Sequence, residues 1–109
     1  MAYDAGLAEV LRGDLTDLPG FTERSMFGGL CFLLNGNMLC GVHPAGGMFR
    51  VGRSNAALAL RVEGATPMAF TGRPMGGMVD MTDEALADDA RRGVLMGLAV
   101  DFVGGLPPK

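Results

Sequence analysis

The most apolar stretch of the chain runs from residue 25 to residue 42, and Asn35 and Gly36 lie near its middle. Asn-Gly is the preferred pair for a two-residue type I′ turn, because both turn positions need a positive φ. The pattern therefore predicts a β-hairpin whose side chains alternate between two faces. Both faces are largely apolar, so we expect a central hairpin that is covered on both sides, by helices of the chain or by another subunit. One face carries Cys31, Leu33, Met38, Cys40 and Val42, and the other carries Phe32, Leu34, Asn37 and Leu39.

Two registers of this hairpin are compatible with the sequence. A two-residue loop places Cys31 opposite Cys40, with Cα atoms about 4.5 Å apart, at the short edge of the range that a disulfide spans. A three-residue loop over 35–37 instead sets Phe32 against Cys40 and separates the cysteines. Buried thiols are the simpler expectation for two cysteines, and the first register keeps a disulfide as an alternative.

Helical periodicity marks both ends of the chain. Asp4 is placed to cap an N-terminal helix that ends at Gly13, and its apolar stripe consists of Leu7, Val10 and Leu11. The last helix is predicted to begin after Thr82 and to end at residues 104–105. Its predicted buried stripe consists of Val94, Leu95, Leu98, Ala99 and Phe102.

The last helix also carries charges and glycines that need an explanation. Asp83 and Glu84 suit its first turn, and Asp88 is expected to pair with Arg91 and Arg92 on the solvent side. Gly93 and Gly97 lie one turn apart inside it, and each costs about 1 kcal/mol relative to alanine. We expect close approach of this helix to the sheet or to a partner in return.

Between the two ends, strand and helix signals alternate. Strands are predicted over 21–27, 48–51, 66–70 and 75–81, with a turn over 71–74, and a helix capped by Ser54 over 55–62. The short links from residue 21 to residue 51 predict an antiparallel meander. The fold class is therefore α+β: a two-layer fold with helices flanking an antiparallel sheet, in the order α-β(3-4)-α-β(2)-α.

Length and composition indicate one small domain. The chain has 109 residues and a net charge of −3, and 49% of its residues are hydrophobic. No apolar run approaches the ~18 residues of a membrane span, and the first residues do not resemble a signal peptide, so we expect a cytoplasmic protein. The acidic balance argues against autonomous binding to nucleic acid, which needs a basic surface.

No catalytic or ligand-binding motif stands out. His43 is the only histidine, and with Cys31 and Cys40 it could form a thiol or metal site, but a zinc site needs more ligands. In the first register, alternation also directs His43 away from the face that carries the cysteines. The glycine pairs match neither a P-loop nor a dinucleotide fingerprint. We therefore expect no catalytic residue, no cofactor and no metal.

Arginines provide most of the positive charge, and four of them could converge on one sheet face or rim. Such a patch would hold an anion or an acidic partner, whereas scattered surface arginines are the simpler interpretation. The four residues are Arg24, Arg50, Arg53 and Arg73.

The run Arg24-Ser25-Met26-Phe27-Gly28-Gly29, followed by an apolar strand and by Asn35-Gly36-Asn37-Met38, resembles the N-terminal domain of the TfoX/Sxy family of bacterial competence regulators. The stretches Pro67-Met68-Ala69-Phe70 and Pro74-Met75-Gly76-Gly77 also fit. The resemblance implies an α+β fold of the kind that secretion chaperones use, and no known catalytic residue or cofactor. Family regulators act as coactivators alongside the cyclic-AMP receptor protein, and they carry a second, C-terminal domain. We expect a single domain over 1–109 without that second domain.

These observations favour a small cytoplasmic regulatory module that binds a protein, forms a homodimer and catalyses no reaction. Its partner is unidentified, and the transcription machinery is one candidate. The alternative is a small-molecule or enzymatic pocket near the hairpin of Cys31 and Cys40. The expected interaction residues are Arg24, Met26, Phe27, Gly28, Gly29, Arg50, Arg53 and Arg73.

Overall fold

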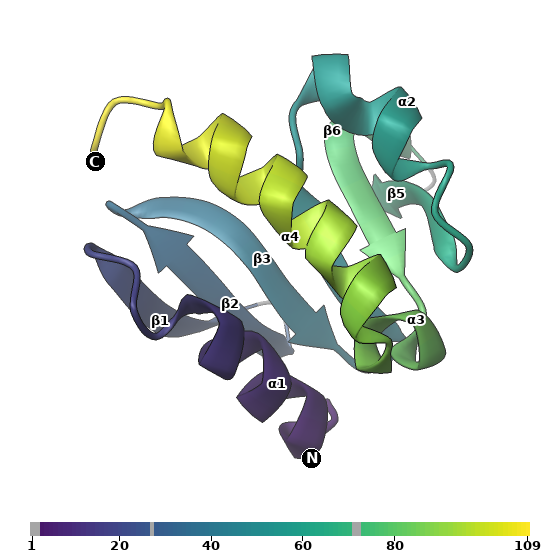
Figure 1. Cartoon of the computed structure of the whole chain (residues 1–109), viewed down its shortest axis with the longest axis horizontal. Helices are drawn as coiled ribbons and strands as arrows, with labels where there is room; N and C mark the ends of the chain where they lie inside the picture. The colour runs from purple at the N-terminus through teal and green to yellow at the C-terminus, as the bar shows by residue number, and fades with distance from the viewer. Residues whose placement is uncertain (1–2, 27, 71–72) are drawn as a thin grey trace.

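Six strands form one antiparallel sheet in the order β1-β2-β3-β4-β6-β5 (Figure 1). The computed structural model describes residues 3–26, 28–70 and 73–109, and the side chains of 69–70 and 73–75 lie outside this description. The first four strands follow one another in space, so the predicted meander is confirmed. The strands are β1 (Phe21–Met26), β2 (Gly29–Leu34), β3 (Asn37–His43), β4 (Gly46–Arg50), β5 (Ala65–Phe70) and β6 (Arg73–Met81).

The helices form a second layer over the sheet. Figure 1 shows α1 and α4 lying across the same face, so the α+β class is confirmed. Within the described ranges, no helix is long and apolar enough to cross a bilayer. The helical elements are α1 (Ala5–Leu15), the 3-10 turn η1 (Arg53–Asn55), α2 (Ala56–Ala59), α3 (Asp83–Ala87) and α4 (Asp89–Gly104).

The main core lies between the sheet and the helices. All six residues of β2 are buried, which agrees with the doubly apolar pattern of its sequence. Phe32 and Phe49 are fully buried at the centre of the core, and Phe21 stacks on Phe32 with ring centroids 5.8 Å apart. Other fully buried side chains around them include Leu11, Leu15, Leu39, Met81, Leu86 and Leu95.

The central hairpin combines features of both predicted registers. Asn35 and Gly36 have φ of 54° and 84°, so the predicted two-residue turn forms, and Leu33 pairs with Met38. Beyond that pair β3 contains one extra residue, Leu39, and Phe32 consequently pairs with Cys40.

This β-bulge separates the cysteines. Cys40 lies in the core under the helices, whereas Cys31 belongs to a second cluster formed by strand residues. Both are free thiols, so the alternative of a disulfide between them is wrong. The physical reason is that the extra residue shifts the alternation of β3 relative to β2.

The N-terminal helix is longer than predicted. The carboxylate of Asp4 accepts a hydrogen bond from the Leu7 amide at 3.1 Å, which confirms the cap. The helix passes through Gly13 and ends at Leu15, because burial of Leu15 in the core outweighs the low helix propensity of one glycine. The buried residues of this helix are Ala8, Leu11 and Leu15. Val10 of the predicted stripe is exposed instead.

The predicted last helix is two helices. Thr82 caps α3, where its hydroxyl accepts from the Ala85 amide at 3.2 Å. The chain leaves the helical conformation at Asp88, whose carboxylate accepts from the Arg91 amide at 3.0 Å and so begins α4. The new helix direction leaves Val94 49% exposed, so its predicted burial is wrong.

The middle of the chain also differs from the prediction. The predicted helix over 55–62 is only the single turn of α2, preceded by η1, and Ser54 lies inside η1 instead of capping a helix. The final strands are longer than predicted, and Arg73 already belongs to β6. Residues 71–72 of the predicted turn lie outside the described residues.

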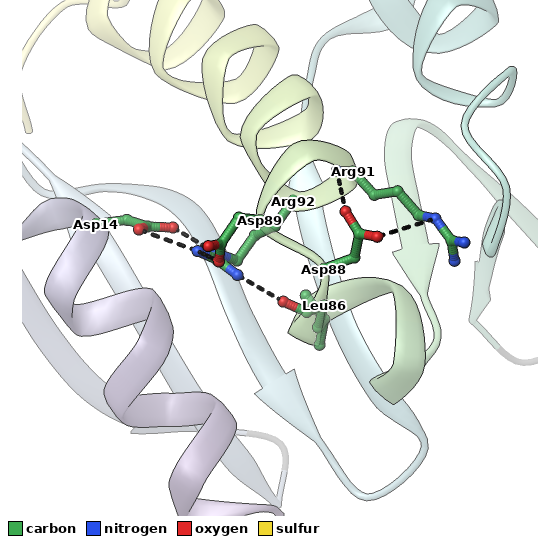
Figure 2. A network of polar contacts seen from close by, with 6 residues as sticks. All are labelled: Asp14, Leu86, Asp88, Asp89, Arg91 and Arg92. Carbon is green, nitrogen blue, oxygen red and sulfur yellow. Dashed lines mark hydrogen bonds and ion pairs between the residues drawn. The ribbon is translucent and has the colours of Figure 1, made fainter.

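A buried guanidinium joins three helices (Figure 2). Arg92, which is 6% exposed, donates from Nε to Asp14 of α1 at 2.6 Å, from Nη1 to the Leu86 carbonyl of α3 at 2.9 Å, and from Nη2 to Asp89 at 2.8 Å. The expectation that Arg92 pairs with Asp88 on the solvent side is therefore wrong, and Arg91 is the partner of Asp88.

We expect Arg92→Ala to lower the free energy of unfolding by about 2–3 kcal/mol, because it leaves the Leu86 carbonyl and Asp14 without their charged donor. The neighbouring Arg91→Ala is the matched control, since its pairs are exposed, and it should cost about 0.5 kcal/mol. Urea unfolding followed by circular dichroism measures both. Equal effects of the two substitutions would contradict the structural role of Arg92.

The glycines of α4 give a second prediction. A Cβ built at Gly93 or Gly97 meets no other atom within 4 Å, so neither glycine serves a close approach to the sheet. Gly93→Ala and Gly97→Ala should each raise the free energy of unfolding by about 0.5–1 kcal/mol. Gly47→Ala should lower it, because its Cβ would lie 2.6 Å from Leu86 and 3.0 Å from the Gly41 carbonyl. Thermal melts of the three variants measure these opposite signs.

Candidate functional site

A cleft lies beside the end of β4, at Arg50. β4 pairs with β3 only as far as Cys40, so Met38 near the start of β3 has no neighbour from β4 in the sheet. The cleft has a volume of about 700 Å³. It is lined by Met38, Arg50, Gly52, Arg53, Ser54, Gly76, Gly77, Met78 and Phe102.

Glycines form the wall of this cleft by allowing two backbone segments to meet. The amides of Val51 and Gly52 both donate to the Gly77 carbonyl, at 2.9 and 3.1 Å. A Cβ at Gly76 would lie 2.9 Å from Nε of Arg53, and Gly77 has a φ of 83°. Gly76 and Gly77 therefore allow the close junction beside Arg53, where a side chain would clash or strain the backbone.

Two of the four predicted arginines come together here. Arg50 and Arg53 both line the cleft, and the guanidinium of Arg50 lies over the Phe102 ring, 5.7 Å from its centroid. Arg24 lies in β1 opposite Cys31, three strands away from β4. Arg73 is in β6, and its side chain lies outside the described residues.

Neither arginine of the cleft has an acidic partner in the described part of the chain. All the ion pairs found there use other cations, namely Arg12, His43, Arg91 and Arg92. The residues outside the description carry no carboxylate side chain. The two guanidinium groups are therefore available to an anion from solution.

The sheet face opposite the helices forms the second feature. A cluster on this face contains one side chain from each of the six strands, and five of the six are methionines. Cys31, Met48 and Met78 are buried at its centre, and the others are half-buried around them. We call this surface the methionine face; it consists of Met26, Cys31, Met38, Met48, Met68 and Met78.

The run of residues 24–29, which carries the family resemblance, contributes to the methionine face and to the β1–β2 hairpin. Met26 is one of the half-buried residues of that face. Gly28 has a φ of 74°, which glycine adopts without strain, and a Cβ at Gly29 would overlap the Val42 carbonyl oxygen. These glycines are explained by the turn and by close strand packing. Phe27 lies outside the described residues.

His43 is held by two contacts, neither of which the sequence predicted. Its Nδ1 accepts from the Ala45 amide at 3.1 Å, so Nε2 carries the proton of the neutral ring and donates to Asp80 at 3.1 Å. Both ring nitrogens are engaged, which leaves no free lone pair on the ring to take a proton from a substrate. Among the described residues, no group of three or more histidine, cysteine or acidic side chains is arranged to hold a metal ion.

The thiols are buried in apolar surroundings. Burial raises the pKa of both Cys31 and Cys40, and the effect is larger for Cys40, which is fully buried. A raised pKa lowers the thiolate fraction, and the thiolate is the reactive form of cysteine.

We therefore expect both thiols to react with Ellman's reagent at least about 100-fold more slowly in the native protein than in concentrated guanidinium chloride. Cys31 should react before Cys40, because it lies on the face opposite the helices. Single variants Cys31→Ala and Cys40→Ala assign each phase. Rapid native reaction of both thiols, or formation of an internal disulfide under mild oxidation, would contradict this arrangement.

The model of the TfoX N-terminal domain family matches residues 14–103. No curated protein and no solved structure matches the chain. The matched range extends from Asp14 to Val103 and includes the whole sheet, the cleft and the methionine face. The chain belongs to the TfoX N-terminal domain family.

Proposed function

We propose that this domain is a regulatory module of the competence-regulator type, which acts by binding another protein and has no catalytic activity of its own. The observation that supports this proposal is the methionine face. Long, unbranched methionine side chains adapt to different surfaces, and methionine-rich surfaces are typical of proteins that bind partners. The engaged ring of His43 and the raised pKa of both thiols support a role without catalysis.

The edges of the sheet are less suitable for binding than its face. Pro67 interrupts the edge strand β5 and removes a backbone donor there. The other edge strand, β1, exposes the polar residues Thr22, Glu23, Arg24 and Ser25. A partner that contacts the methionine face would cover Met26, Met38 and Met68, which are half-buried in the single chain.

We propose further that a second copy of the chain can occupy this face as a homodimer when the partner is absent. A second copy related by a two-fold axis would cover the half-buried Met26, Met38 and Met68 of both chains. The net charge of −3 favours a protein over a nucleic acid as the partner.

Met68→Lys tests the proposal, because it places a charge on the methionine face at a half-buried position. Val94→Lys is the matched control, since Val94 is 49% exposed on α4. Proteins captured from the source cell by the immobilised wild-type domain should also bind Val94→Lys, and their recovery should fall at least about tenfold with Met68→Lys.

Light scattering of the same three proteins measures self-association. A mass of twice the single chain for the wild type and Val94→Lys, with a single-chain mass for Met68→Lys, would support the homodimer. Equal capture by Met68→Lys and the wild type would exclude the methionine face as the binding surface. Failure of the wild-type domain to retain any protein would contradict the proposed function itself.

A further inference from the structure

We propose that the cleft beside β4 binds a small organic anion, with its carboxylate or phosphate on Arg50 and Arg53 and its apolar part on Met38, Met78 and Phe102. This inference goes beyond the proposed function and does not depend on a protein partner. The cleft differs from the pocket expected near Cys31 and Cys40, because neither cysteine lines it.

Among the described residues, the lining of the cleft contains two cations and no acidic side chain. The protein has 12 acidic and 9 basic Lys and Arg side chains, yet Arg50 and Arg53 meet at one cleft without a carboxylate partner in the described chain. A cleft that is lined by two cations and by no carboxylate attracts an anion. Guanidinium groups bind carboxylates and phosphates with paired hydrogen bonds, which gives geometric specificity.

Contacts on the wall of the cleft position the two arginines. Cζ of Arg50 lies 5.7 Å from the centroid of the Phe102 ring, and this contact limits the motion of the Arg50 guanidinium. The absence of a side chain at Gly76 leaves room for Arg53 against β6. Gly52, with a φ of 87°, packs so closely on Phe102 that a Cβ would lie 2.5 Å from its ring. The wall that presents both cations is thus fixed by packing.

Size and lining decide which anion fits. A volume of about 700 Å³ is within the range of about 300–1,000 Å³ that small-molecule sites occupy. Two methionines and one phenylalanine provide an apolar surface beside the cations. Inorganic phosphate alone would leave this apolar surface uncovered. A flat organic anion would use both parts of the cleft.

Calorimetric titration with phenyl phosphate, benzoate, inorganic phosphate and phenol tests this proposal. We expect saturable binding of phenyl phosphate or benzoate, and at least about tenfold weaker binding of inorganic phosphate and of phenol, because each retains only one of the two contacts. Tighter binding of phenyl phosphate would indicate a phosphate ligand, and tighter binding of benzoate would indicate a carboxylate ligand. Amide shifts in two-dimensional NMR should be confined to the residues that line the cleft and their immediate neighbours, namely 38, 50–54, 76–78 and 102.

Arg50→Gln and Arg53→Gln should each weaken binding of the aromatic anion about tenfold or more, through loss of a charged hydrogen bond. Arg24→Gln is the matched control, because Arg24 lies on β1 away from the cleft, and it should bind as the wild type does. Thermal melts confirm that all three variants fold. Absence of saturable binding by both aromatic anions, or equal weakening by Arg24→Gln and Arg53→Gln, would overturn the proposal.

Discussion

The extra residue of β3 determines which face of the sheet the following side chains of β3 occupy. Leu39 lies opposite no residue of β2, and both Leu39 and Cys40 are consequently buried under the helices. Met38, on the other side of the bulge, lies on the methionine face and lines the cleft. One added residue thus separates the two cysteines and adds both Leu39 and Cys40 to the core, while Met38 keeps the side it has in a hairpin without a bulge.

The two faces of the sheet have different roles in this fold. The helical face contains the main core and the Arg92 network that joins α1, α3 and α4. The opposite face contains a smaller cluster made only by strands, with partly exposed methionines around it. Stability therefore depends mainly on one face, and the proposed protein partner uses the other.

Close backbone contacts explain much of the glycine content near the cleft. Gly52 approaches the Phe102 ring, and Gly77 accepts hydrogen bonds from two consecutive amides. Two hydrogen bonds also hold residues 107–109 against the central hairpin. The Lys109 amide donates to the Asn35 carbonyl, and the Asn37 side chain donates to the Pro107 carbonyl. These contacts join backbone segments at the rim of the sheet beside the cleft.

The sequence alone predicted the elements that depend on local chemistry. The Asn35-Gly36 turn, the Asp4 cap, the antiparallel meander and the α+β class follow from φ preferences, capping and side-chain periodicity. The grouping of Arg50 with Arg53 was foreseen only as one possibility among four arginines. The bulge at Leu39, the burial of Arg92 and the contact of His43 with Asp80 were decided by tertiary structure. Each of these joins residues that are distant in sequence or depends on how elements pack, and local periodicity contains no information about such contacts.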